Sequence, residues 1–88
     1  MYPRQVAESL SEALAKEITN LRSEKGLSKN QTATQSGLAV SFVSDLESGK
    51  RRASVETLVK LAWVFGTSPS AILAKCEQFV KFTPSKEA

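Results

Sequence analysis

The chain has 88 residues, 41% of them hydrophobic, and a formal net charge of +3, with no His and one Cys. This length allows one small domain with a modest core, and the hydrophobic content excludes an intrinsically disordered chain. Because His is absent, the chain has no Cys-His or Ser-His nucleophile and no Cys/His zinc cluster, so we expect neither an enzyme nor a metal cofactor.

The lone cysteine and the hydropathy pattern indicate a compartment. Cys76 has no partner for an internal disulfide, which suits a reducing cytoplasm, and its apolar helical surroundings predict a buried thiol. No apolar run approaches the ~18 residues of a membrane span, and the N-terminus lacks a signal-peptide pattern. We therefore expect a cytoplasmic protein with no membrane contact. We also expect no small-molecule substrate and no regulation by a small molecule, because the chain is too small to hold a sensor domain.

Apolar residues recur every three or four positions in the first part of the chain, at Val6, Leu10, Leu14, Ile18 and Leu21. This spacing predicts one long amphipathic helix over about residues 3–25, ended by Gly26. Its start has two alternatives, which are Pro3 as a first helical residue and a capping box formed by Ser9 and Glu12.

Two short helices joined at a glycine come next. Ser28 and Gln31 fit a capping box, which predicts a helix over Lys29–Ser36. Gly37 then supplies the positive φ of a tight turn, and a second helix follows over about Val40–Ser48. This arrangement predicts a helix-turn-helix, whose second helix can enter the major groove of DNA.

Two further helices complete the chain. Ser54 can cap a fourth helix that ends at Gly66, and Ser68 with Pro69 begins a fifth over about residues 69–80. The inner face of the fourth helix is predicted to carry Val55, Leu58, Leu61, Ala62 and Phe65. We read residues 83–88 as a frayed tail. The sequence therefore predicts one all-α domain over residues 1–88, with five helices and no strands.

Positive charge is concentrated on the helix-turn-helix and just after it. Residues 1–24 sum to −1, residues 25–52 to +3 and residues 53–88 to +1. A polyanionic partner would produce this asymmetry, although a solvated loop can also carry the run Lys50-Arg51-Arg52 without any partner. Beside a helix-turn-helix, the distribution favours DNA as the partner.

An ordered series of residues from Ile18 to Leu73 resembles the Cro and phage-repressor type of helix-turn-helix protein, also called the xenobiotic-response-element family. The matching residues are Leu21-Arg22, Gly26-Leu27-Ser28, Gln31, Ala33, Gly37-Leu38, Val43-Ser44, Leu46-Glu47, Gly49-Lys50-Arg51, Glu56-Thr57-Leu58, Leu61-Ala62, Phe65-Gly66 and Ser68-Pro69-Ser70. The resemblance implies a compact five-helix domain, with its core in residues 18–73, that binds double-stranded operator DNA to control transcription, usually as a symmetric homodimer.

The resemblance also implies roles for single residues. The positions that contact bases correspond to Val40, Ser41, Ser44 and Asp45. Chemically, a Val can touch a thymine methyl group and an Asp can accept from a cytosine amino group. The positions that contact the DNA backbone correspond to Lys29, Ser48, Lys50, Arg51 and Arg52.

Three more residues have an expected role on the helix-turn-helix. Phe42 either presses on the DNA backbone or covers the seam between helices, and aromatic side chains more often pack in a core. Arg22 and Glu47 match a pair that often forms a salt bridge in this family. We predict a partly buried pair that ties the first helix to the end of the recognition helix, against the alternative of two exposed charges worth under about 1 kcal/mol.

The sequence departs from the family pattern in three places. Thr32 and Ser36 replace apolar residues, so the second helix either packs less tightly or turns a polar face inward. Ala39 replaces the usual Ser or Thr cap of the recognition helix, a loss of about 1 kcal/mol. The recognition face also lacks Arg, Gln and Asn, so DNA shape or a partner protein is expected to supply part of the specificity.

Aromatic residues outside the main apolar stripes raise the question of self-association. Trp63, Phe79 and Phe82 form a candidate dimer interface. The alternative, weighted equally, is that the long first helix folds across Trp63 and buries it. A second hypothesis for function is a protein-interaction module, such as an antitoxin or co-regulator, that keeps the fold and binds a partner protein through the first helix or the C-terminal aromatic residues.

Overall fold

The computed structural model describes residues 4–81, and this range contains five α-helices and no strand. The helices are α1 (Arg4–Glu24), α2 (Lys29–Ser36), α3 (Val40–Ser48), α4 (Val55–Phe65) and α5 (Pro69–Val80). The predicted all-α class and five-helix architecture are therefore confirmed. Pro3, Phe82 and the predicted tail at 83–88 lie outside the described residues.

Serine caps set where three of the helices begin. The hydroxyl oxygens of Ser28, Ser54 and Ser68 each accept a hydrogen bond from a first-turn amide of α2, α4 and α5. At α2 the box is complete, because the Gln31 side-chain oxygen accepts from the Ser28 amide at 2.8 Å. Helix α1 begins at Arg4, so the alternative start at Ser9 is wrong.

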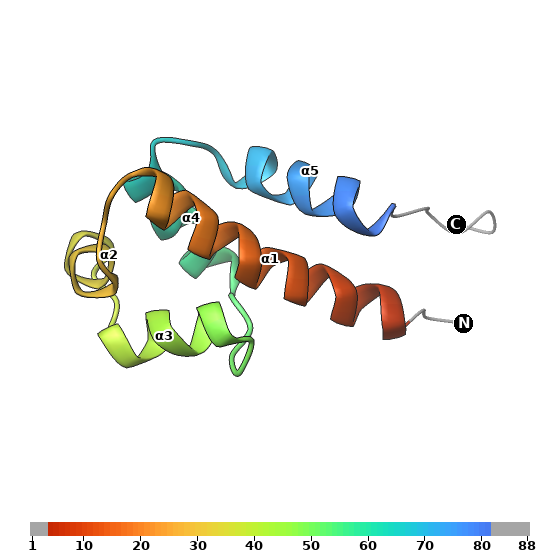
Figure 1. Ribbon diagram of the computed structural model, residues 1–88, viewed down its shortest axis with the longest axis horizontal. Coiled ribbons are helices and arrows are strands. Elements are labelled where there is room, and N and C mark those ends of the chain that lie inside the picture. Colours follow the sequence, from red (N-terminus) through yellow and green to blue (C-terminus); the bar gives the residue numbers. More distant parts are fainter. Residues whose placement is uncertain (1–3, 82–88) are drawn as a thin grey trace.

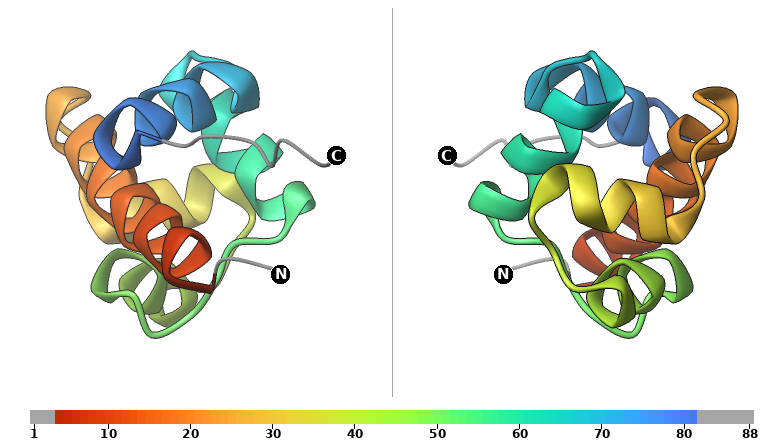
Figure 2. Two further views of the ribbon diagram at one scale, coloured as in Figure 1. Left: turned by 90° about the vertical axis from the view of Figure 1, so that its right-hand side faces the viewer. Right: turned by 90° about the vertical axis from the view of Figure 1, so that its left-hand side faces the viewer.

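Helix α1 is the central element of the bundle. It runs antiparallel beside α5, while α3 lies on its other side and α2 bridges α3 and α4 (Figures 1 and 2). Since α3 and α5 occupy opposite edges of the molecule, the outer face of α3 is free of the C-terminal helix.

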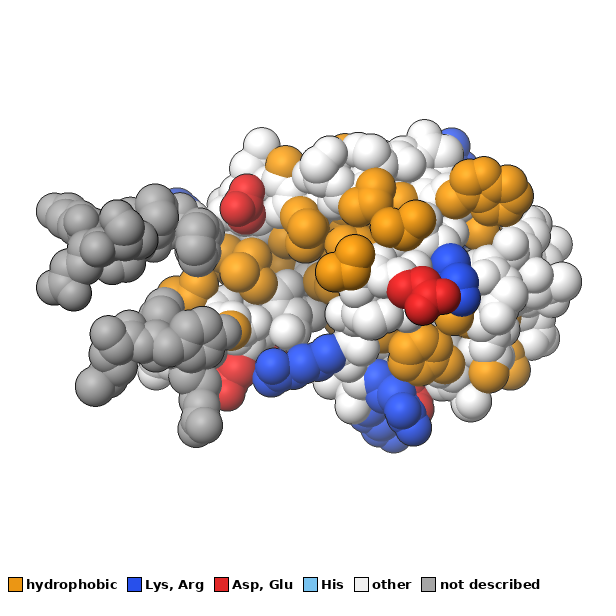
Figure 3. Space-filling model, turned by 180° about the vertical axis from the view of Figure 1, so that it is seen from behind, with side chains coloured by type: hydrophobic (Ala, Val, Ile, Leu, Met, Phe, Trp, Pro, Cys, Tyr) orange, Lys and Arg blue, Asp and Glu red, His pale blue; other side chains and the backbone are white. Residues whose placement is uncertain are grey.

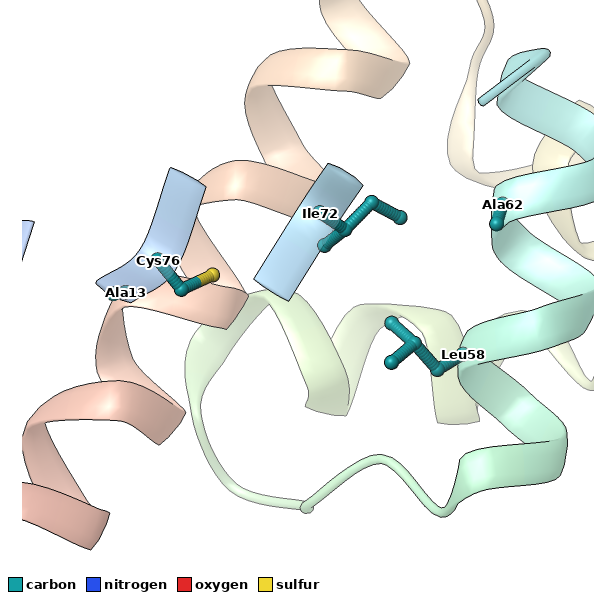
Figure 4. Close-up of a cluster of buried hydrophobic side chains, with 5 residues drawn as sticks. All are labelled: Ala13, Leu58, Ala62, Ile72 and Cys76. Carbon is teal, nitrogen blue, oxygen red and sulfur yellow. The ribbon is translucent and has the colours of Figure 1, made fainter. Parts of the chain in front are cut away.

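The core consists of two adjoining clusters of buried side chains. The first joins α1, α4 and α5 and is made by Ala13, Leu58, Ala62, Ile72 and Cys76 (Figure 4). The second joins α1, α3 and α4 and is made by Ile18, Leu46, Leu61 and Phe65. Removing such side chains from water is the main driving force for folding, and the second cluster anchors α3 to the rest of the domain.

Cys76 lies in the first cluster with no exposed surface, which confirms the predicted buried thiol. Desolvation raises the pKa of this thiol, and the nearby charge of Glu17 raises it further. The side chain is therefore a neutral packing group at physiological pH.

Four polar side chains are also buried in the described part of the chain: Glu17, Thr32, Ser36 and Thr57. Ser36 donates through Oγ to the Thr32 carbonyl oxygen at 2.7 Å, whereas Thr32 Oγ1 is buried without a hydrogen-bond partner among residues 4–81. Helix α2 thus turns a polar face inward, one of the two outcomes expected for these residues. Between α1 and α5, the Glu17 carboxylate is 3% exposed, with Oε2 3.6 Å from Lys75 Nζ.

One side of α4 is exposed where the sequence predicted burial. Val55 is 79% exposed, so its assignment to the inner face is wrong. The inner face is centred on Leu58, Leu61 and Phe65, and Val55 lies rotated away from it in the first turn. Trp63 is 75% exposed, which also rules out the alternative that α1 covers it.

Helices α4 and α5 meet at a sharp bend of 101°. Pro69 occupies the first turn of α5, where its missing amide hydrogen costs nothing. Within residues 4–81, no single helix has the length and apolar character to cross a membrane, and only this bent pair reaches those limits when its two halves are counted together.

Candidate nucleic-acid interface

The turn between α2 and α3 is closed by main-chain hydrogen bonds. Gly37 has φ 74°, and its amide donates to the Ala33 carbonyl oxygen, as does the amide of Leu38 at 3.0 Å. A residue with a side chain would be strained at this positive φ. Ala33 is buried and small, so α2 and α3 cross closely beside the turn. The orientation of α3 relative to α2 is therefore fixed locally.

A buried ion pair fixes the other end of α3. Arg22 on α1 donates through Nε to Glu47 Oε2 at 2.7 Å and through Nη2 to Oε1 at 3.0 Å. Its Nη1 donates to the Leu27 carbonyl oxygen at 2.9 Å, and Thr19 Oγ1 donates to Glu47 Oε1 at 3.2 Å. The hydrogen bond to Glu47 raises the pKa of Arg22, so the guanidinium stays charged. The structure contains the ion pair that the family resemblance implied.

One side of α3 faces away from the core. Val40, Ser41, Ser44 and Asp45 are spaced i, i+1, i+4 and i+5, and all four retain exposed surface. The inward positions are Val43 and Leu46, which are buried. Ala39 has the extended backbone of an N-cap residue but offers no side-chain hydrogen bond to the helix start. The four predicted base-contacting residues thus share one outward surface.

Cationic side chains flank this surface. Lys29 begins α2, and its Nζ donates to Ser44 Oγ at 3.5 Å. Beyond the C-terminal end of α3, Lys50, Arg51 and Arg52 are exposed in the loop that precedes α4. Ser48 lies between these groups and donates through Oγ to the Asp45 carbonyl oxygen at 3.1 Å. The predicted backbone-contacting residues therefore flank the outward face of α3.

Phe42 does two things at once. It is half-buried and packs against the second core cluster, in line with the packing interpretation. Its ring also lies under the guanidinium of Arg51, with 5.9 Å between the Arg51 Cζ atom and the ring centroid. Arg51 Nε is 3.6 Å from Asp45 Oδ2. This grouping of Phe42, Arg51 and Asp45 was not predicted from the sequence. It depends on the chain reversal at Gly49, which has φ 81°.

A cavity of about 350 Å³ separates the first half of α1 from the loop after α3. Glu8 and Glu12 line it on the α1 side, and Arg51 and Arg52 line it on the loop side. No ion pair joins these acidic and basic groups in the part of the chain that the structure describes, and no cluster there can hold a metal ion. Arg51 and Arg52 are therefore not paired with the acidic residues of α1.

Comparison with known proteins decides the family. A family model described as "Helix-turn-helix" matches residues 18–72. The chain belongs to the helix-turn-helix family of Cro and phage-repressor type. It is similar to the HTH-type transcriptional regulator PuuR of Escherichia coli, with 35% identity over 66 residues, which cover 75% of this chain and 36% of PuuR.

Solved structures of this helix-turn-helix type match most of the bundle. The clp gene regulator ClgR of Corynebacterium glutamicum gives a TM-score of 0.76 at 26% identity, covering 82% of this chain and 77% of that one. The restriction-modification controller protein C.AhdI of Aeromonas hydrophila gives 0.67 at 33% identity, covering 69% of this chain and 92% of that one. The five-helix bundle is thus a helix-turn-helix DNA-binding fold.

The family consists of transcriptional regulators and not of enzymes. The chain spans two thirds or less of the length of the curated relatives that it matches. Its α2 and α3 correspond to the two helices that give the family its name. The outward face of α3, flanked by cations, is accordingly the candidate nucleic-acid interface.

Proposed function

We propose that this chain is a transcriptional regulator that binds operator DNA as a symmetric dimer, with α3 in the major groove. The observation that carries the proposal is the outward face of α3, which holds short polar side chains and is flanked by Lys29 of α2 and by Lys50 to Arg52 of the following loop. A helix fits the width of the major groove, and cations that flank it can contact the two phosphate strands that border the groove. Such a regulator acts in the cytoplasm, where the DNA lies.

Phosphate contacts would supply most of the affinity. Lys29 stands in the first turn of α2, where the helix dipole also favours an anion. Lys50, Arg51 and Arg52 add three cations after α3. Each phosphate neutralised releases a counterion, so binding would weaken steeply with salt. The base contacts, from Val40 to Asp45, would supply sequence preference.

The dimer part of the proposal rests on an exposed apolar stripe. Val55, Val59 and Trp63 lie one helical turn apart on α4, and we call these three residues the α4 stripe. Leu73 and Phe79 on α5 are exposed as well. Figure 3 shows hydrophobic side chains on this face of the molecule, with Lys and Arg side chains along its lower edge. Of the three residues predicted for a dimer interface, Trp63 and Phe79 are exposed and Phe82 lies outside the described residues; Val55, Val59 and Leu73 were not among the residues predicted for this role.

A selection from a random duplex library at moderate salt tests the proposal. A symmetric dimer is expected to enrich a palindrome whose half-sites lie about one helical turn, ~34 Å, apart. Retention of DNA without any enriched sequence would contradict a sequence-reading regulator. Failure to retain DNA at all would contradict the whole proposal.

Two matched lysine variants distinguish a phosphate contact at the proposed interface from the general effect of losing one positive charge. Lys50→Ala is expected to reduce the slope of log K against log salt by about 1.8 for the symmetric dimer, because each protomer loses one phosphate contact worth about 0.9. Lys60→Ala on α4 removes the same charge far from α3 and is expected to leave the slope unchanged. Equal effects of the two variants would contradict the assignment of the surface.

Sedimentation tests the dimer. The wild-type chain is expected to sediment as a dimer, and Trp63→Glu in the α4 stripe as a monomer with an intact helical spectrum. A wild-type monomer at high concentration, both with and without DNA, would contradict the dimer. That result would favour the second candidate function, in which the exposed stripe binds a different protein, as an antitoxin or co-regulator does.

A further inference from the structure

Helix α3 itself carries no Arg or Lys, the side chains that read guanine best, and Lys29 of α2 is engaged by Ser44 Oγ at 3.5 Å. The residues of its outward face are Val40, Ser41, Ser44, Asp45 and Ser48, whereas guanine is read best by an arginine that spans its O6 and N7 acceptors. An arginine brought onto this face from elsewhere in the chain would fill that gap. The structure contains one candidate, in the loop after α3.

The backbone carries Arg51 back toward α3. Gly49 reverses the chain with φ 81°, and the amides of Lys50 and Arg51 then donate to the Asp45 carbonyl oxygen at 2.9 and 3.2 Å. Arg51 therefore begins at the C-terminal end of α3, where the chain has turned back toward the helix.

The side chain of Arg51 continues in the same direction. Its guanidinium lies over the ring of Phe42 in the first turn of α3, at 5.9 Å from the centroid, and its Nε is 3.6 Å from Asp45 Oδ2. Asp45 thus holds Arg51 through both its carbonyl oxygen and its carboxylate. The positive charge lies beside the N-terminal half of α3, which is the half that contacts base edges in helix-turn-helix proteins.

We propose that Arg51 reads a guanine in the major groove, with Asp45 and Phe42 as the residues that position its guanidinium. This inference rests on the proposed binding of operator DNA. Because Asp45 engages Nε, both terminal nitrogens of Arg51 remain free to donate to O6 and N7. Asp45 then acts through Arg51 and does not itself accept from a cytosine.

Its ion pair with Asp45 and its contact with Phe42 both favour Arg51 over its neighbours as the residue that reads guanine. A bare carboxylate at Asp45 would be repelled by the phosphates, and pairing with Arg51 neutralises it. A side chain that is already held in place loses less conformational freedom on binding. Within residues 4–81, no ion pair or ring contact holds Arg52 in this way. Arg52 is therefore the matched control.

The experiment is to select preferred duplexes with the wild-type chain and then with Arg51→Ala, Asp45→Asn and Arg52→Ala, with circular dichroism as a check on folding. The wild type is expected to enrich a guanine at one fixed position in each half-site. Arg51→Ala is expected to lose discrimination at that position by about 5- to 150-fold, the range measured for a bidentate arginine-guanine contact. Arg52→Ala is expected to weaken all duplexes about equally, with base preferences intact.

Asp45→Asn tests the positioning role. It is expected to reduce discrimination at the same guanine, and the double variant with Arg51→Ala is expected to lose no more than Arg51→Ala alone. The inference is overturned if Arg51→Ala weakens every duplex equally, since Arg51 is then a phosphate contact. It is also overturned if Asp45→Asn changes the preference at a different base pair.

Two results on the wild type distinguish the role proposed for Arg51 from the proposed binding of operator DNA. Binding of DNA without an enriched guanine would leave DNA binding in place and overturn only the role of Arg51. No binding of any duplex would overturn both.

Discussion

Arg22 on α1 and Glu47 near the end of α3 share two hydrogen bonds, at 2.7 and 3.0 Å, with only 17% and 5% of their side-chain surfaces exposed. A guanidinium that binds a carboxylate through two nitrogens restricts both the distance and the relative orientation of the groups. The pair therefore sets the angle at which α3 projects from the bundle.

Arg22→Leu is expected to lower the free energy of unfolding by about 1–3 kcal/mol, because Glu47 is left buried without its cation. Arg22→Lys is expected to lose part of that stability, since an ammonium cannot span both carboxylate oxygens. Urea unfolding measures both values. The exposed Glu56–Lys60 pair on α4, at 3.2 Å, is the control. Its variant Glu56→Gln is expected to cost under about 0.5 kcal/mol, and an equally small effect at Arg22 would contradict the role given to the pair.

Thr32→Val is expected to stabilise the fold by about 1 kcal/mol. The Thr32 hydroxyl oxygen is buried and has no hydrogen-bond partner in residues 4–81, and valine has the same shape without the polar atom. Thr34→Val, at an exposed position of the same helix, is expected to change stability by less than about 0.5 kcal/mol. Loss of stability in Thr32→Val would show that the hydroxyl is satisfied.

Ala39→Ser is expected to raise the free energy of unfolding by about 1 kcal/mol, since it supplies the missing cap of α3. The backbone of Ala39 already has the extended conformation of an N-cap residue, with φ −71° and ψ 143°. Ser54→Ala removes an existing cap from α4 and is expected to change stability by a similar amount in the opposite sense. Thermal melting of both variants gives the comparison, and no gain from Ala39→Ser would contradict the account of the helix start.

Stability is expected to fall at alkaline pH because of Cys76. Its folded-state pKa is raised by burial, so below the ordinary thiol pKa of about 9.0 the thiol is protonated in both states and its contribution is complete. Above that value the unfolded chain ionises first, and folding loses at most about 1.4 kcal/mol per pH unit.

Urea unfolding of the wild type and of Cys76→Ala across this pH range isolates the thiol. The variant is expected to show a shallower decline, because it retains the lysines and lacks only the thiol. Parallel pH profiles would mean that Cys76 does not titrate differently on unfolding.

Local signals account for the parts of the fold that the sequence predicted. The Ser28–Gln31 box and the glycines at 37 and 49 are short-range features, and the predicted bounds of α2 and α3 agree with the structure. The first helix lacked such a signal at its start, and there two alternatives remained. The Arg22–Glu47 pair is a long-range contact that became predictable only through the family resemblance.

Features that depend on how the helices pack were missed. The spacing of Val55 relative to Leu58 fits an inner face, but Leu58 is buried whereas Val55 is exposed, so the inner face of α4 does not extend to Val55. Glu17 gave no sign of burial, because its cover comes from Lys75 on α5. The approach of Arg51 to Asp45 depends on the chain reversal after α3 and was not predicted, whereas the family resemblance assigned the two residues separate contacts with DNA.

The most direct test of the central claim is a titration of the isotope-labelled chain with duplex DNA, followed through its amide NMR resonances. If α3 enters the major groove, the largest shifts will fall on Val40–Ser48, on Lys50 to Arg52 and on the start of α2, while the α4 stripe changes little. Shifts centred on α4 and α5, or none at any salt concentration, would contradict the assignment of this surface to DNA.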